Sequence, residues 1–278
     1  MIHAEGLSFT YATQSEPALS GIGLRVSAGE AVGIIGCDGS GKSTLLQVLA
    51  GLAPRLVKGS RQGSLCIAGL DPAKAETAAR MRTVGLVFSD PASQLTGVCP
   101  TVEEEIAWSL GNIGESRQAM HRKAEDLIGR LHLEHIRFRT PHTLSSGQQQ
   151  LVAIASVLIL KPKVLLFDEP ATRLDAASRR AVADLAKQLA REGHTVLWSS
   201  SSLEDVDGFS RWIYLERGQI LYDGAPRHVG GQAWPAPWTR LAQAAKEAGK
   251  WPGPMPLREA DAAEELRKMS AAARQLSP

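Results

Sequence analysis

Short apolar runs bounded by glycine, proline or charged residues recur along most of the chain. The runs at 29–36, 63–69, 83–88 and 163–170 are short and almost uniformly apolar. This pattern predicts strands that are buried on both faces. A further buried strand is predicted to begin at 194–196.

Two segments have the apolar spacing or composition of helices. In the segment 42–52, Leu45, Leu46 and Leu49 can share one helix face. The segment 178–193 also has helical character and ends in glycine, which commonly closes a helix. Strands that alternate with helices predict an α/β fold.

The strand pattern is absent from the middle of the chain, between about 90 and 150. A helix is predicted to begin there with a capping box formed by Thr101 and Glu104, and the later segments are helical in composition. The middle of the chain is therefore predicted to be helical.

A stretch rich in proline, glycine and tryptophan follows residue 229 and precedes two predicted helices that extend to residue 278. We therefore predict a main domain over 1–228 and a small helical C-terminal tail over 229–278.

Composition excludes several classes of protein. The 278 residues are 44% hydrophobic, which is enough to fill one substantial core, and the net charge of +2 does not favour nucleic acid as a partner. Three cysteines are too few for a disulfide framework. The N-terminus lacks the features of a signal peptide, and the longest uncharged apolar stretch, 151–160, is shorter than the ~20 residues of a membrane span.

The strongest chemical motif is GCDGSGKS at 36–43, which fits G-x-x-x-x-G-K-[ST] between a predicted strand and a predicted helix. Its glycines let backbone amides turn inward around phosphates. Lys42 is expected to reach the terminal phosphates and Ser43 to ligate Mg²⁺, while Cys37 is interpreted as a spacer. The predicted nucleotide-binding residues of this loop are Gly36, Cys37, Asp38, Gly39, Ser40, Gly41, Lys42, Ser43 and Thr44.

A second motif, VLLFDEP, places two carboxylates at the end of a predicted buried strand. Asp168 is suited to the Mg²⁺ shell, and Glu169 is suited to polarise an attacking water. An acidic pair alone is often only a solvated strand end. Downstream of a phosphate-binding loop, the pair favours a catalytic role for Glu169 and a metal-binding role for Asp168.

A third motif, LSSGQQQ at 144–150, precedes a predicted helix. Ser145 and the amides around Gly147 would form another anion-binding helix start, although alone this is an ordinary N-cap. Together the three motifs resemble those of the ATP-binding-cassette (ABC) ATPases, whose signature is close to LSGGQ. Ser146 replaces the first signature glycine, which weakens the expected phosphate contact.

The resemblance covers roughly 1–228 and implies a P-loop NTPase core that binds ATP, with a helical subdomain at about 91–155. It also implies a head-to-tail dimer, in which each ATP lies between one subunit's P-loop and the partner's Ser145, Gly147 and Gln148. Tyr11 lies where the family places an aromatic residue that stacks on adenine. For that residue alone, a strand-end tyrosine is a nearly equal alternative.

A narrower resemblance concerns the segment 84–114. Its VFSDP, Gln94 and TVEEEIAW are similar to the VFQNP, glutamine and TVEEEIAFG of energy-coupling-factor transporter ATPases. The tail also resembles the C-terminal helices of that group, which help to hold the ATPase dimer. A generic alanine-rich helix pair is the alternative for the tail.

Two positions depart from this family pattern. Ser201, in the run WSSSSL, aligns with a histidine that contacts the γ-phosphate and the catalytic water, although a register shift to Ser200 is possible. His194 lies at the opposite end of the predicted strand and cannot replace it. Ser89 occupies the position of a glutamine that contacts Mg²⁺ and water and senses the membrane partner. Losing a water-orienting group typically costs on the order of 10²–10⁴ in rate.

These observations predict an ATP-binding subunit of an energy-coupling-factor type importer for a vitamin or metal ion, with weak hydrolysis at its own site. The expected partners are a second ABC ATPase, an integral membrane scaffold and a substrate-binding membrane subunit, at the inner face of the cell membrane. One alternative is a non-hydrolytic structural subunit of a heterodimer. A soluble non-transport ABC protein is disfavoured because no second cassette, charged linker or basic face is visible.

Overall fold

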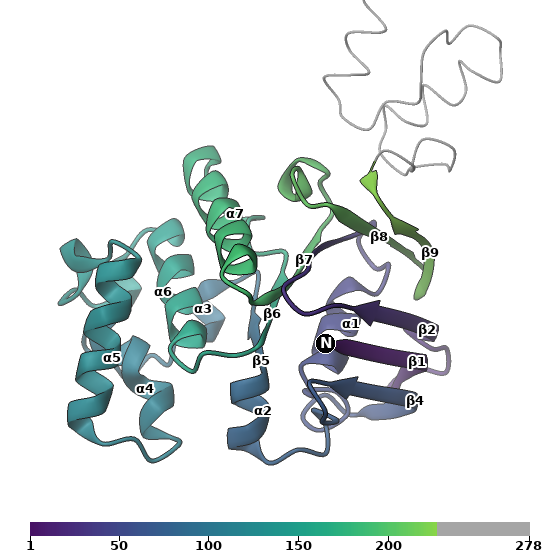
Figure 1. The fold of residues 1–278 in the computed structure, drawn as a ribbon, viewed down its shortest axis with the longest axis horizontal. Coiled ribbons are helices and arrows are strands. Elements are labelled where there is room, and N and C mark those ends of the chain that lie inside the picture. The colour runs from purple at the N-terminus through teal and green to yellow at the C-terminus, as the bar shows by residue number, and fades with distance from the viewer. Residues whose placement is uncertain (227–278) are drawn as a thin grey trace, which may run out of the picture.

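The computed structural model describes residues 1–226, and the predicted tail at 229–278 lies outside the described residues. Two sheets and a group of helices form the described part (Figure 1). The predicted α/β fold is confirmed.

The larger sheet has six strands in the order β5-β6-β7-β3-β8-β9. All neighbours pair in parallel except β8 and β9, which are antiparallel. The strands are β3 (Ala31–Ile35), β5 (Val84–Val87), β6 (Val164–Asp168), β7 (Thr195–Ser200), β8 (Arg211–Glu216) and β9 (Gln219–Gly224). Because β3, β5, β6 and β7 are parallel, their C-terminal ends meet at one edge, where polar residues of distant segments come together.

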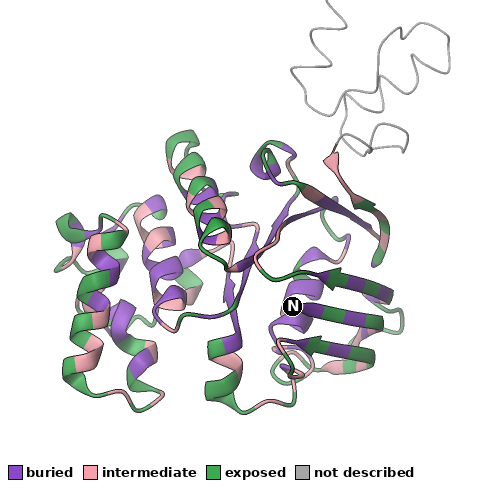
Figure 2. Cartoon of the chain, viewed as in Figure 1, coloured by how far each residue is buried: buried purple, intermediate pink, exposed green. Residues whose placement is uncertain are grey.

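The smaller sheet is antiparallel and has the order β2-β1-β4. Its strands are β1 (Ile2–Tyr11), β2 (Leu19–Val26) and β4 (Gly59–Ile67). From Ile22 to Val26 of β2 every second residue is buried, which leaves one face of the sheet in solvent (Figure 2).

The helices lie mainly in two groups. The helix α1 (Lys42–Leu49) packs in the core beside the smaller sheet, and α2 (Thr77–Thr83) contacts β5. The middle of the chain forms α3 (Pro91–Gln94), α4 (Val102–Gly111), α5 (Arg117–Arg130) and α6 (Ser146–Leu158). The helix α7 (Ala176–Arg191) follows β6. The described segment 91–158 contains no strand, as the sequence predicts.

Two apolar cores lie on opposite faces of the larger sheet. In β7, Leu197 belongs to the core shared with α1 and the smaller sheet, whereas Val196 and Trp198 belong to the core shared with α4 to α7. In β6, likewise, Leu166 belongs to the core with α1, whereas Phe167 belongs to the core with α4 to α7. Side chains at successive strand positions therefore point to different layers of the molecule.

Two local features were not predicted. The strand predicted to begin at 194–196 continues through Ser199 and Ser200, which are the last residues of β7 and are buried. They pair with β3 on one side, and Ser199 also pairs with β6 on the other. In the predicted capping box of α4, Thr101 accepts a hydrogen bond from the Glu104 amide, but the return bond from the Glu104 side chain is not formed.

Candidate functional site

The phosphate-binding loop connects β3 to α1, as predicted. Gly41, the residue before α1, has φ 105°, a left-handed conformation that favours glycine. A Cβ on Gly36 would lie 2.3 Å from the Leu215 carbonyl oxygen, so a larger residue is sterically excluded there. The glycines of the motif are thus required by backbone conformation and by close packing against β8.

Lys42 begins α1 and is only 4% exposed. Its amine donates to the carbonyl oxygens of Gly36 and Cys37 at 2.8 and 3.1 Å. The same amine lies 3.1 Å from Oε1 of Glu169. A buried cation is therefore held at the mouth of the loop, where it can pair with an anionic ligand.

Asp168 ends β6 next to α1. Its Oδ1 accepts hydrogen bonds from the hydroxyl groups of Ser43, at 2.9 Å, and Ser199, at 3.0 Å. Burial raises the pKa of the Asp168 carboxyl, and the two hydroxyl groups act in the opposite direction. Burial disfavours the charged form of this carboxylate, and a cation bound beside it would stabilise that form.

Glu169 follows the strand and has φ 46°, which is unusual for a residue other than glycine. The Thr172 hydroxyl donates to its Oε2 at 3.3 Å, and the Thr172 amide donates to its carbonyl oxygen, also at 3.3 Å. Such backbone conformations cost about 1–3 kcal/mol and tend to occur at functional sites.

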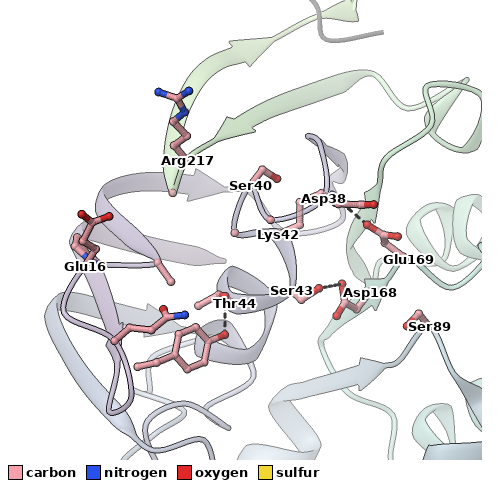
Figure 3. Close-up of a pocket in the computed structure, with 17 residues that line it drawn as sticks. Glu16, Asp38, Ser40, Lys42, Ser43, Thr44, Ser89, Asp168, Glu169 and Arg217 are labelled. Atoms are coloured by element: carbon pink, nitrogen blue, oxygen red, sulfur yellow. Dashed lines mark hydrogen bonds and ion pairs between the residues drawn. The ribbon is translucent and has the colours of Figure 1, made fainter. Parts of the chain in front are cut away.

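These groups line a cavity of about 700 Å³ (Figure 3). The predicted residues that line it are Tyr11, Asp38, Gly39, Ser40, Gly41, Lys42, Ser43, Thr44, Ser89, Asp168 and Glu169. Figure 3 shows Ser43 directed toward Asp168 and Glu169 near Lys42, whereas Thr44 lies farther from the two carboxylates. Tyr11 ends β1, and its hydroxyl lies 2.7 Å from the Thr44 hydroxyl.

Several cavity residues carry no sequence motif. They are Gln14, Glu16, Pro17, Ala18, Arg217 and Gly218. They lie in the connection between β1 and β2 and in the turn between β8 and β9. The Gly218 amide donates to the Ser40 carbonyl oxygen, and the Ser20 amide donates to the Gly218 carbonyl oxygen, each at 2.9 Å. These backbone hydrogen bonds bring both segments to the phosphate-binding loop. Of these residues, only Pro17 and Gly218 are of types that predict a turn, and nothing in the sequence predicts that either turn lies at the cavity.

Other predicted residues lie outside this cavity. Gly36 and Cys37 belong to the loop but do not line the cavity, and Ser201 is exposed beyond the end of β7. The signature residues Ser145, Gly147 and Gln148 form the start of α6, where Ser145 and Gln148 make a complete capping box. None of these three signature residues lines the cavity.

The cavity is chemically suited to a nucleotide and a divalent cation. The buried Lys42 amine and the backbone of the glycine-rich loop line the cavity, and both can bind phosphate oxygens. Mg²⁺ is commonly held by one or two carboxylates together with substrate phosphates. Among the described residues there is no group of three or more His, Cys, Asp or Glu side chains that could hold a metal, so Ser43 and Asp168 would depend on the nucleotide for further ligands.

Comparison with known proteins decides the family. The family model described as "ABC transporter" matches residues 19–172 of the chain, which include the phosphate-binding loop, the signature helix and the carboxylate pair. The chain belongs to the ABC transporter family. Its α/β core and helical segment are therefore those of an ABC ATPase.

Relatives within the ABC family match most of this chain. It is 34% identical to the energy-coupling factor transporter ATP-binding protein EcfA of Methanosarcina acetivorans, over 82% of this chain and 81% of the relative. It is 37% identical to a putative ABC transporter ATP-binding protein of Bacillus cereus, over 84% of this chain. The match spans only 42% of that relative's own length.

Solved ABC structures share the fold. The dimeric ATP-binding cassette MJ0796 in a post-hydrolysis state bound to ADP and Pi matches with a TM-score of 0.71 and 28% identity, over 81% of this chain and 98% of that one. CbiO1 from Clostridium perfringens, part of the ABC transporter complex cbiONQ, matches with a TM-score of 0.72 and 26% identity, over 88% and 94%. In the described part of this ABC protein, no helix has the length and apolarity needed to cross a membrane.

Proposed function

We propose that this chain is the ATP-binding subunit of an energy-coupling-factor type importer and couples ATP binding and hydrolysis to uptake of a vitamin or metal ion. The observation that carries the proposal is the convergence of Lys42, Ser43, Asp168 and Glu169 on one cavity. The likeness to an EcfA protein and to CbiO1 supports the importer class. Substrate contacts belong to other subunits in such systems.

In the proposed site, residues 36–44 would hold the ATP phosphates, with Lys42 at the terminal phosphates. Tyr11, whose hydroxyl contacts Thr44, would stack on the adenine. Ser43 and Asp168 would hold Mg²⁺, which neutralises phosphate charge when bound. Glu169 would polarise the attacking water. Its carboxylate contacts the Lys42 amine in the structure, and when a phosphate pairs with that amine, the carboxylate would be released to contact the water.

Weak hydrolysis at this site is part of the proposal. Ser89 lines the cavity, but its side chain is shorter than the glutamine expected from the family. Ser201 is exposed and does not line the cavity at all. Glu169 is thus in place to polarise the water, without the two groups that would orient that water. The same observation favours the second candidate, a non-hydrolytic structural subunit.

A partner cassette is proposed because the signature helix start lies apart from the chain's own cavity. In a head-to-tail pair, Ser145, Gly147 and Gln148 would complete the partner's site, and the partner's signature would complete this one. Two weak sites in a homodimer would give little turnover. A heterodimer with a cassette that carries both the glutamine and the histidine is therefore the proposed form, located on the inner face of the cell membrane.

A groove on the helical segment is proposed as the docking surface for the membrane scaffold. It has a volume of about 510 Å³, and its walls include Val98, Trp108 and Phe138, which are exposed large hydrophobic residues. Phe138 is 74% exposed. Exposed apolar surface of this kind is typical of an interaction site.

Co-purification from the native cell tests the proposed assembly. We expect a second, non-identical cassette and a membrane scaffold to be recovered with this chain. Phe138→Asp should lose the scaffold and retain ATP binding, whereas Leu56→Asp, at a similarly exposed apolar position (69%), should retain both. Recovery of a homodimer with full transport activity would contradict the heterodimer.

A further inference from the structure

Ser199 lies in β7, the strand that neighbours β6 and the two carboxylates of the site. It is fully buried in β7, opposite Asp168 of β6 in the parallel register. Its hydroxyl donates to Oδ1 of Asp168 at 3.0 Å and accepts the Glu169 amide at 3.0 Å. One hydroxyl thus uses its single proton on one residue of the pair and a lone pair on the other.

These contacts restrict how Asp168 can be oriented. Oδ1 receives both the Ser43 and the Ser199 hydroxyl protons, and in the described part of the chain no hydrogen bond involves Oδ2. With its proton directed to Asp168, the Ser43 oxygen retains lone pairs for a cation. The Ser199 bond therefore holds the carboxylate from β7, in addition to the Ser43 bond from α1, and leaves its second oxygen free.

The bond to the Glu169 amide acts on the backbone. Glu169 has a left-handed φ of 46°, which its surroundings must impose because the side chain disfavours it. The Ser199 hydroxyl holds the amide at the beginning of this residue, and Thr172 holds its carbonyl oxygen at the end. The direction in which Glu169 leaves the strand depends on both contacts.

We infer that Ser199 is a positioning residue for the metal site: its hydroxyl orients Asp168 for the divalent cation and fixes the turn at Glu169. This inference rests on the proposed Mg²⁺ site at Ser43 and Asp168. Outer-shell hydrogen-bond partners of metal ligands typically contribute 10–100-fold to metal affinity.

Ser200 provides a matched control within the same strand. It is equally buried, at 3% exposure, but the strand alternation directs it to the other face of the sheet. There its hydroxyl donates to Oδ2 of Asp205 at 2.7 Å and accepts the Ser202 amide at 2.9 Å. Ser200→Ala therefore removes a comparable buried hydroxyl without touching Asp168 or Glu169.

The test is calorimetric titration of the full chain with ATP, once with Mg²⁺ and once with EDTA, for the parent, Ser199→Ala and Ser200→Ala. The readout is the ratio of the two dissociation constants, which a general loss of stability would not change selectively. This ratio gives the gain in ATP affinity that Mg²⁺ provides. In Ser199→Ala we expect this gain to fall at least about tenfold, with ATP affinity in EDTA unchanged. Ser200→Ala should keep the parent's gain.

An unchanged gain in Ser199→Ala, or an equal loss in Ser200→Ala, would overturn the inference while leaving the proposed Mg²⁺ site intact. A parent that shows no Mg²⁺-dependent gain would overturn both. If Ser199→Ala does not fold, Ser199→Cys serves instead, because it preserves the buried volume and replaces the hydroxyl with a weak donor. We expect Ser199→Cys to show the same selective loss.

Discussion

Tyr11 allows a test of adenine stacking at a single residue. It lines the cavity, and its hydroxyl contacts Thr44. Tyr11→Ala should weaken ATP binding about tenfold, since stacking of a base on an aromatic ring contributes about 1–3 kcal/mol. Tyr11→Phe should bind nearly as well as the parent, because it keeps the ring. Equal losses in both variants, measured by calorimetry, would show that the contact with Thr44 matters instead of the ring.

The other residues of the cavity differ in how well the sequence predicts them. Lys42, Ser43, Asp168 and Glu169 were predicted because each belongs to a motif whose chemistry depends on spacing, and the structure brings them together. Glu16 and Arg217 were not predicted, because they lie in turns without a motif and reach the cavity only through backbone hydrogen bonds of the folded chain. No local pattern records such long-range contacts.

At the scale of elements, the buried strands and the long helices follow from the sequence, but their ends do not. The helix predicted over 178–193 is observed over Ala176–Arg191, because Asp175 caps it by accepting bonds from the amides of Ala177 and Ser178. The serines at the end of β7 have low strand propensity. Pairing of both serines with β3, pairing of Ser199 with β6, and hydrogen-bond partners for both hydroxyl groups override that propensity.

An ion cluster joins α4 to the segment that follows α5. Arg137 donates two hydrogen bonds to the Glu103 carboxylate, at 2.8 and 3.0 Å, and these bonds lower the pKa of Glu103 below its ordinary value of 4.5. Glu103→Gln should reduce the free energy of unfolding at neutral pH by about 1–3 kcal/mol, which is typical of hydrogen bonds to charged groups. Urea unfolding of parent and variant measures the difference.

The pH dependence of that difference follows from the lowered pKa. A carboxylate that is more acidic in the folded state stabilises the protein above its unfolded pKa, and this stabilisation is lost as the pH falls through the folded pKa. The difference between parent and Glu103→Gln should therefore be largest near neutrality and shrink below about pH 4. Glu104→Gln, at the exposed neighbouring position, should show little effect at either pH. A difference that stays constant from neutral to acidic pH would contradict this role of the ion cluster.

For the whole molecule, the two sheets and the helical segment place the cavity and the signature helix start at separate positions. The sequence predicted this division because an ABC-like pattern implies completion of each site by a partner. The fold and the family are confirmed, whereas the dimer and the level of hydrolysis remain predictions. A single chain contains no information on the geometry of its partner.

The serines at the two sensor positions give a test of weak hydrolysis in the assembled protein. Ser89→Gln and Ser201→His together should raise phosphate release at least about tenfold, because Glu169 already supplies the carboxylate. The two changes should be non-additive, since both groups act on one water and one phosphate. The assay is steady-state phosphate release from the reconstituted dimer, with the partner's site silenced at its own P-loop lysine. A parent that already matches the double variant would show that the serines do not limit hydrolysis.

Binding of MgATP to the cavity is the basis of every role proposed above. Calorimetric titration of the purified chain with ATP and Mg²⁺, compared with Lys42→Ala, tests it most directly. Lys42 is the buried cation at the phosphate end of the cavity, so its loss should weaken binding at least about 100-fold while the thermal unfolding profile is retained. We expect the parent to bind one ATP per chain at submillimolar concentration. Absence of binding by the parent at millimolar ATP, or equal binding by the variant, would contradict the proposed site.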